Sequence, residues 1–123
     1  MDPRMKVPGP DHPITVEASS SHITVKATGN PVAETRSPLA LREASYPVTY
    51  YVPLADVDPS VLRPSATTSY CPFKGEASYY DVVTQAGTVK DAIWTYEHPY
   101  DAVSEIAGHV AFYADRVELS VDA

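Results

Sequence analysis

The chain has 123 residues, the usual size of one domain and too short for two full ones. Hydrophobic residues make up 44% and charged residues 20%, so the composition is that of a folded protein rather than a disordered one. The net charge of -7 argues against nucleic acid as a partner. Twelve prolines argue against a helical bundle, because each removes a backbone donor, and nine tyrosines favour strands.

Cysteine content and hydropathy limit the class of protein further. Cys71 is the single cysteine, which excludes a disulfide framework and a zinc site built from paired cysteines. No apolar run approaches the ~20 residues that a membrane span needs. The N-terminal residues also lack the apolar stretch of a signal peptide. The sequence therefore predicts a cytoplasmic protein that does not interact with a membrane.

The first third of the chain changes from proline-rich to alternating. Residues 1–13 contain four prolines and no periodicity, which predicts an extended arm before a single domain over 14–123. Residues 14–18 and 23–27 alternate apolar and polar side chains, and the serines at 19–21 predict a hairpin between them. Further strands are expected over residues 32–35, 39–46, 48–52, 67–70, 76–84 and 89–96.

Two short segments have helix signals. Asp58 followed by Pro59 predicts one helical turn, with the aspartate as its cap and the proline as its first residue. Residues 101–107 are the best helix candidate, because Asp101 can cap the start and Gly108 suits the end. Both segments are too short to change the fold class.

The chain ends in two more expected strands. Residues 110–113 and 117–121 predict a closing hairpin around the turn between them. Seven to nine short strands at close spacing indicate an all-β domain. We expect coiled or orthogonally packed antiparallel sheets, with one short helix near residues 101–107.

A tight turn around Cys71 is the segment most suggestive of chemistry. Cys71 lies three residues before Lys74, and a nearby ammonium favours the nucleophilic thiolate. No spacing selects one histidine as its base; His12 and His98, each held extended by a following proline, are the candidates. The alternative is a buried structural cysteine with the lysine in water, since free cysteine is often buried.

Acidic residues offer weaker candidates. Asp56 and Asp58 have the spacing that puts two carboxylates on one side of a strand, where a divalent ion could bind. Asp58 is better explained as a helix cap, and no histidine pair has metal-ligand spacing. We therefore expect no metal and no cofactor. Arg42 and Glu43 would point to opposite faces of a strand, so one of them is a candidate for burial beside a polar partner.

Aromatic residues occur as neighbours on the expected strands. In each pair one ring should face the interior and the other the opposite surface. Such rings line a small apolar pocket or form the core between two sheets, and the sequence leaves both interpretations open. They are Tyr50, Tyr51, Tyr79, Tyr80, Trp94, Tyr96, Phe112 and Tyr113.

A succession of motifs resembles the DUF427 family over nearly the whole chain. The motifs are residues 8–14 (PGPDHPI), 41–47 (LREASYP), 50–53 (YYVP), 56–57 (DV), 68–79 (TxxCPFKGxAxY), 94–96 (WTY), 106–108 (IAG) and 111–113 (AFY). The resemblance implies a small soluble all-β protein of bacterial or fungal type, with coiled sheets of the β-tent or Mss4-like kind and no established activity. The family's nucleotidyltransferase-like label has no motif here, and the zinc-binding cysteine pairs of related folds are absent.

The polar and aromatic positions within these motifs suggest a binding site. We expect a small-molecule pocket between sheets, formed by Arg42, Glu43, Tyr51, Thr68, Lys74, Tyr79 and Trp94. One alternative is an enzyme that uses Cys71 as nucleophile with His12 or His98 as base. Another is a non-catalytic interaction domain, and the sequence leaves homodimerisation through a sheet edge undecided.

Overall fold

The computed structural model describes residues 2–122, and most of them lie in antiparallel strands. The strands are β1 (Ile14–Ala18), β2 (His22–Ala27), β3 (Asn30–Thr35), β4 (Leu39–Glu43), β5 (Thr49–Pro53), β6 (Leu62–Cys71), β7 (Gly75–Thr84), β8 (Gly87–Thr95), β9 (His109–Phe112) and β10 (Glu118–Asp122). A seven-stranded sheet has the order β1-β4-β5-β9-β8-β7-β6, and a three-stranded sheet has the order β10-β2-β3.

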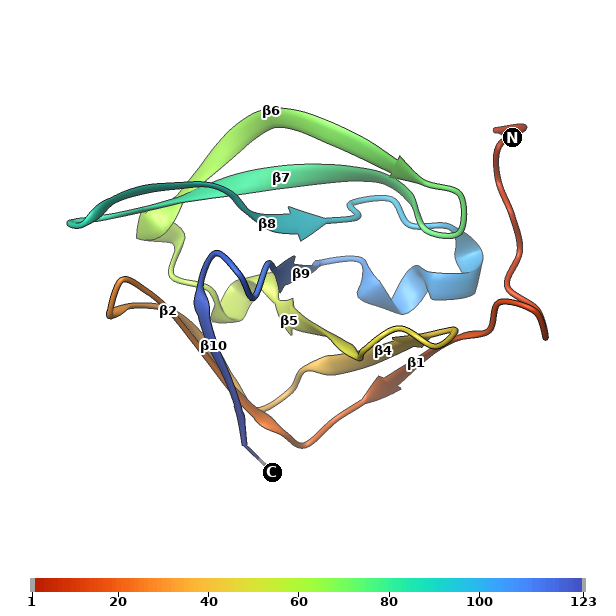
Figure 1. Ribbon diagram of the computed structural model, residues 1–123, viewed down its shortest axis with the longest axis horizontal. Coiled ribbons are helices and arrows are strands. Elements are labelled where there is room, and N and C mark those ends of the chain that lie inside the picture. The colour runs from red at the N-terminus through yellow and green to blue at the C-terminus, as the bar shows by residue number, and fades with distance from the viewer. Residues whose placement is uncertain (1, 123) are drawn as a thin grey trace.

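The seven-stranded sheet curls back over itself. In Figure 1, β6, β7 and β8 form the upper layer, β1, β4 and β5 form the lower layer, and β9 lies between them. Strand β9 joins the layers because it pairs with both, with Val110 opposite Val52 of β5 and Phe112 opposite Ile93 of β8. The prediction of an all-β fold with coiled antiparallel sheets and a short helix is confirmed.

The interior contains two hydrophobic cores. The first lies between the three-stranded sheet and the larger one, and includes Ile23, Val25, Val52, Val82 and Ile93. The second lies inside the curl of the larger sheet and consists of Leu41, Tyr51, Ala77, Tyr96, Val103, Ile106 and Ala111. Because two tyrosines belong to the second core, this interior is more polar than the first.

Two hairpins expected from the sequence are wrong. Strand β1 pairs with β4 rather than β2, and β10 pairs with β2 rather than β9. The tight hairpins β2–β3, β6–β7 and β7–β8 each have a glycine at positive φ in or beside the turn, namely Gly29, Gly75 and Gly87. The segments 19–21 and 114–116 contain no glycine, so they lack the residue that most readily supplies the backbone geometry of a tight hairpin.

Three short 3-10 helices interrupt the strands: η1 (Leu54–Asp56), η2 (Pro59–Val61) and η3 (Asp101–Ile106). The predicted cap of η2 is confirmed, because the Asp58 carboxylate accepts a hydrogen bond from the Ser60 N–H at 2.9 Å. The predicted cap of η3 is wrong, since Tyr100 occupies the cap position and makes no side-chain cap bond. Instead η3 is held by Val103 and Ile106, which are fully buried in the second core.

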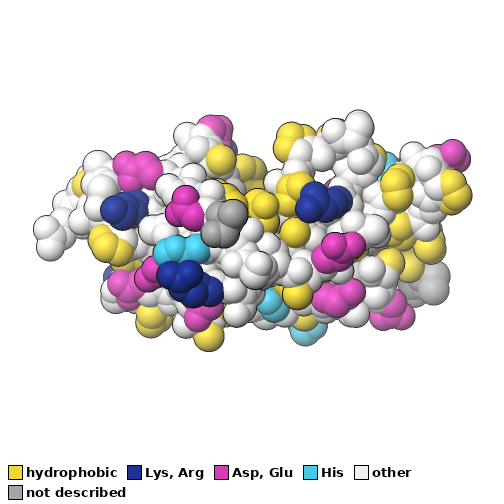
Figure 2. Space-filling model, turned by 90° about the horizontal axis from the view of Figure 1, so that it is seen from below, with side chains coloured by type: hydrophobic (Ala, Val, Ile, Leu, Met, Phe, Trp, Pro, Cys, Tyr) yellow, Lys and Arg dark blue, Asp and Glu magenta, His cyan; other side chains and the backbone are white. Residues whose placement is uncertain are grey.

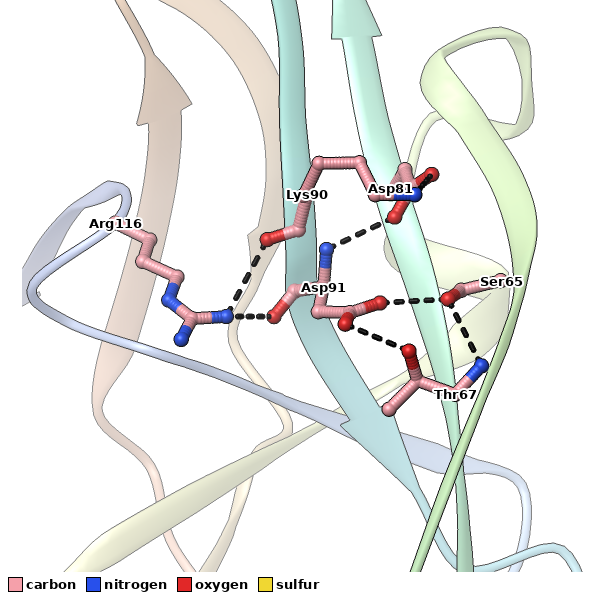
Figure 3. A network of polar contacts seen from close by, with 6 residues as sticks. All are labelled: Ser65, Thr67, Asp81, Lys90, Asp91 and Arg116. Atoms are coloured by element: carbon pink, nitrogen blue, oxygen red, sulfur yellow. Dashed lines mark hydrogen bonds and ion pairs between the residues drawn. The ribbon is translucent and has the colours of Figure 1, made fainter.

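A polar network around Asp91 connects three neighbouring strands (Figure 3). The Asp91 carboxylate accepts hydrogen bonds from the hydroxyls of Ser65 at 2.6 Å and Thr67 at 2.8 Å, and the Asp91 N–H donates to the Asp81 carboxylate at 2.8 Å. The guanidinium of Arg116 donates to its carbonyl. The registers of β6 against β7 and of β7 against β8 both shift here, so the network stabilises two adjacent bulges that bend the sheet.

The N-terminal residues 2–13 contain no helix or strand and lie against the turn after β6. The Lys6 N–H donates to the Pro72 carbonyl at 2.9 Å, and Gly9 and His12 form an isolated bridge. Position 1 of the expected arm and position 123 of the expected domain lie outside the described residues. The arm therefore contacts the domain at the segment that contains Cys71.

Charged side chains are dispersed over the face shown in Figure 2, which is the underside of Figure 1. Acidic side chains lie there among lysine, arginine and histidine side chains. Among residues 2–122, no helix has both the length and the apolar content to cross a membrane. On the face shown in Figure 2, the acidic side chains that contribute to the net charge of -7 are not gathered into one patch.

Candidate functional site

A cavity of about 210 Å³ lies inside the curl of the seven-stranded sheet. Strands from both layers and the turn between β6 and β7 contribute to its walls. The lining residues are Leu41, Glu43, Thr49, Tyr51, Lys74, Tyr79, Trp94, Tyr96 and Tyr113. Several of these also belong to or pack against the second core, so the cavity adjoins that core.

Strand alternation decides which side chains reach the cavity. Leu41 and Glu43 are two residues apart on β4 and therefore share one face of the sheet. Thr49 and Tyr51 do the same on the neighbouring strand β5. The Arg42 side chain, between Leu41 and Glu43 on β4, points to the opposite face of the sheet and is exposed to solvent. The sequence expectation that Arg42 and Glu43 point to opposite faces is thus met, with the glutamate on the inside.

The turn between β6 and β7 places Lys74 in the wall. This lysine is only 7% exposed, and its N–H donates to the Cys71 carbonyl at 3.2 Å to close the turn. Its carbonyl accepts from the Tyr100 N–H at 3.0 Å, which connects the turn to the segment before η3. Gly75 follows with a φ of +111°, a conformation that a side chain strongly disfavours. The backbone thus fixes where the lysine enters the cavity.

Glu43 forms the charged centre of the site. Its Oε1 accepts from the Lys74 Nζ at 2.5 Å, and its Oε2 lies 2.7 Å from the His12 Nε2. Burial opposes ionisation of Glu43, but the hydrogen bonds from Lys74 and His12 outweigh it, so its pKa lies below the ordinary value. The carboxylate is therefore ionised at neutral pH, and both of its oxygens are already engaged.

The N-terminal arm provides the third member of this cluster. The His12 ring stacks on Phe73 with 4.1 Å between ring centroids and an interplanar angle of 4°. Phe73 directly precedes Lys74 in the turn, so the arm and the turn hold each other through this stack. His12 thus helps to fix Glu43 from outside the cavity, whose lining it does not join.

Aromatic rings form one wall of the cavity. The rings of Trp94 and Tyr113 are 4.5 Å apart between centroids, and Tyr113 is parallel to Tyr79 within 4°. The Trp94 ring also meets the Tyr51 ring edge-on at 6.4 Å. Such pairs are stabilising beyond their buried area, so the rings of this wall support one another.

Three tyrosine hydroxyls at the site have raised pKa values and remain protonated well above neutral pH. Burial raises the pKa of Tyr51 and of Tyr96, because it disfavours the phenolate form. Burial and the hydrogen bond to Tyr79 raise the pKa of Tyr113 to about 12. These groups therefore act as neutral hydrogen-bond donors or acceptors.

The structure brings together five of the seven residues expected to bind a ligand. Glu43, Tyr51, Lys74, Tyr79 and Trp94 line the cavity. Arg42 and Thr68 do not, and both are exposed. Thr68 pairs with Ser78, so by alternation it lies on the face opposite to that of Tyr79.

Cys71 lies beside the site rather than in its lining. It is partly buried against the second core, and its Sγ lies 3.7 Å from the Lys74 Nζ. Among the contacts of residues 2–122, His12 bonds to Glu43 and neither candidate histidine bonds to Cys71. His98 is exposed in the loop after β8.

Four lining residues were not among the seven expected to bind a ligand, although the two tyrosines were named among the aromatic residues of a pocket or core: Leu41, Thr49, Tyr96 and Tyr113. Three of them are two residues from a candidate on the same strand or its direct continuation, and so share its face. Leu41 precedes Glu43, Thr49 precedes Tyr51, and Tyr96 follows Trp94. The period of two that identified the strands could therefore have added them, whereas Tyr113 follows β9 and has no such neighbour.

Metal-ligand geometry is absent from residues 2–122, where no three His, Cys, Asp or Glu side chains gather to hold an ion. The two aspartates of the D-x-D motif have local partners. Asp56 accepts from the Thr35 hydroxyl at 2.6 Å, and Asp58 caps η2 through Ser60. Their side chains are therefore accounted for by the fold.

Comparison with known proteins gives one match to a family model. The model, described as a domain of unknown function (DUF427), matches residues 15–123. The matched range contains every residue that lines the cavity, and it begins after His12. A search of curated proteins finds no match.

Proposed function

The chain belongs to the DUF427 family, and we propose that it is a small-molecule-binding domain whose ligand occupies the cavity inside the curled sheet. The observation that carries this proposal is the buried pair of Lys74 and Glu43 in the cavity wall. A buried ion pair adds little net stability compared with apolar residues of similar volume, because both charges lose their hydration. Placing one beside a cavity lined by aromatic rings is better explained by recognition than by folding.

The size of the cavity limits the ligand. Pockets for drug-sized molecules are about 300–1,000 Å³, whereas this cavity is about 210 Å³. The ligand, or the part of it that enters the cavity, is therefore a small molecule with a single ring or a short chain. Every lining residue except Leu41 has a polar side-chain atom, so we expect the ligand to form hydrogen bonds as well as contacts with the aromatic rings.

Trp94 makes the proposal directly testable, because it is the single tryptophan of the chain and lines the cavity. We expect small aromatic compounds to change its fluorescence in a saturable way and to raise the melting temperature. The variant Thr49→Phe places a ring in the cavity and should abolish both effects. Thr88→Phe changes an exposed threonine on β8 outside the cavity, and it should bind like the parent.

Two results would reject the binding proposal. In the first, no compound in a broad set of small aromatic and aliphatic molecules changes the fluorescence or the melting temperature. In the second, Thr49→Phe folds normally and binds as well as Thr88→Phe, which would locate binding elsewhere.

The alternative of a cysteine enzyme has weaker support from the geometry. The Lys74 ammonium lies near the Cys71 sulfur, but it is engaged by Glu43. A base within hydrogen-bond reach of the thiol is also needed, and His12 is held by Glu43 instead. We therefore treat Cys71 as a residue of the turn that positions Lys74.

A further inference from the structure

We infer that the ligand is a small planar molecule that presents a carbonyl or carboxylate oxygen to the hydroxyls of Tyr51 and Tyr96 and to the ammonium of Lys74. This inference rests on the proposed function and adds the chemical class of the ligand. It follows from which hydrogen-bonding groups of the cavity already have protein partners and which do not.

Tyr96 provides the first free donor. Its side chain lines the cavity, and its hydroxyl makes no hydrogen bond with any of residues 2–122. Within the same residues, no buried side-chain nitrogen or oxygen lacks a partner, so this hydroxyl is not sealed in the core. It must therefore reach the open space of the cavity. A buried tyrosine normally satisfies its O–H, so the absence of a protein acceptor here leaves that position to a ligand or water.

Tyr51 provides the second free donor. Its oxygen accepts a hydrogen bond from the Trp94 Nε1 at 3.3 Å. The indole group can only donate, so the phenol proton of Tyr51 is directed to another acceptor. No acceptor for it is found among residues 2–122. Because burial raises the pKa of Tyr51, the proton stays in place throughout the neutral range.

The ion pair of Lys74 and Glu43 leaves an unused N–H donor on the lysine and engages both oxygens of the glutamate, the strongest acceptor of the site. Lys74 has three N–H donors; one bonds to Glu43 and another approaches the Cys71 sulfur at a weak 3.7 Å. Both oxygens of Glu43 are engaged, by Lys74 and by His12. The charges of the lysine and the glutamate cancel, so the cavity offers no net attraction to a cation. The unused capacity of this pair is thus donor capacity, which an oxygen acceptor would satisfy.

The expected shape of the ligand follows from the aromatic residues that line the cavity. Trp94 and Tyr113, whose ring planes are tilted by 46° to each other, both line the cavity, and Leu41 provides an aliphatic contact. Flat rings stack favourably on flat rings, whereas a branched aliphatic body would leave gaps in a cavity of about 210 Å³. A single aromatic ring with one acceptor group meets both conditions.

The experiment compares three probes of nearly equal size: benzoate, benzamide and benzylamine. Trp94 fluorescence and melting temperature are followed at neutral pH. Benzoate and benzamide should bind with dissociation constants of roughly 1 mM, as expected for so few atoms. Benzylamine, which replaces the acceptor by a cationic donor, should bind at least about tenfold more weakly, because its ammonium would face Lys74 and two phenol protons.

Tyrosine variants test the two donors separately. Tyr96→Phe and Tyr51→Phe should each weaken benzoate by about tenfold, the effect of losing one hydrogen bond to a charged oxygen. Tyr80→Phe is the matched control, because the Tyr80 side chain points to the face of β7 opposite to that of Tyr79 and packs against the first core. It should bind benzoate like the parent. Melting curves of all three variants without ligand identify any loss of folding.

The outcomes separate this inference from the binding proposal. If benzylamine binds at the cavity as well as or better than benzoate, or if both tyrosine variants keep the parent affinity, the acceptor class is overturned while small-molecule binding stands. If all three probes and all other small compounds fail, the binding proposal is rejected and the ligand class with it.

Discussion

Single side chains explain why the site is polar although the curl around it is apolar. Lys74 exposes only 9% of its side chain and Glu43 only 16%, so each would be costly to bury alone. Lys74 donates a hydrogen bond to one oxygen of the Glu43 carboxylate and stabilises its charged form, and His12 bonds to the other oxygen. The three residues come from an arm, a strand and a turn, so the charge cluster also connects these segments.

The Lys74–Glu43 pair should show strong coupling in a double-mutant cycle. Glu43→Gln leaves the lysine charge buried without its counter-charge and should lower the free energy of unfolding by about 3 kcal/mol. Lys74→Met should cost a similar amount, while the double variant should cost much less than the sum. Urea unfolding measures all three variants.

A second ion pair of this chain provides the control. Lys90 pairs with Asp81 at 3.2 Å, but 73% of its side chain is exposed. Lys90→Met should therefore change the free energy of unfolding by less than about 1 kcal/mol. Additive effects of Glu43→Gln and Lys74→Met would contradict the view that the buried pair acts as a unit.

At the level of the site, sequence reasoning could identify residue types but not always their direction. Glu43, Lys74 and Trp94 were recognisable because charged and aromatic residues within motifs need an explanation. Arg42 was equally recognisable, and only the phase of strand β4 against its neighbours decides that it faces outward. That phase depends on pairing between strands, which a local pattern does not contain.

Among the secondary-structure elements, turns decided which strand pairings could be predicted. A glycine at positive φ marks each tight hairpin, whereas the expected hairpins at 19–21 and 114–116 have none. The alternation of side chains identified the strands themselves, with β1 predicted at its observed limits. It does not identify partners, so the pairing of β1 with β4 and of β10 with β2 could not be derived from it.

The turn at Gly75 should be sensitive to substitution. Gly75 has a φ of +111°, outside the left-handed region that other residues adopt, so Gly75→Ala should cost about 1–3 kcal/mol of unfolding free energy. The strain would also displace Lys74 and weaken benzoate binding. Urea unfolding and Trp94 fluorescence measure the two effects.

Gly29→Ala is the matched control for this turn. Gly29 has a φ of +79°, nearer to the left-handed region, and an added Cβ would meet open space. It lies in the hairpin between β2 and β3, away from the cavity. We expect a smaller loss of stability, about 1 kcal/mol, and unchanged binding. Equal effects of the two substitutions would show that the Gly75 turn is not specially constrained.

The whole molecule depends on the curl of one sheet. Composition argued only against a helical bundle, and the close spacing of short strands indicated the all-β class. The curl itself results from bulges in β6 and β8, from the Asp91 network and from a central strand, β9, that pairs with both layers. These are contacts between distant segments, so neither the curl nor the cavity inside it could be obtained from local patterns.

The pH dependence of stability should have two limits set by groups at the site. Glu43 has a lowered pKa, so its contribution is present above the ordinary value of 4.5 and is lost as the pH falls below it. Tyr51 and Tyr96 have raised pKa values, so their contribution is present below the ordinary value of 10.0 and is lost as the pH rises above it. Urea midpoints measured across the pH range should therefore show a plateau between these limits. Glu43→Gln should make the acid side alone less steep, and Tyr96→Phe should make the alkaline side alone less steep, because other shifted groups remain in each variant. A Glu43→Gln profile that falls on the acid side as steeply as the parent's would contradict the role given to the carboxylate.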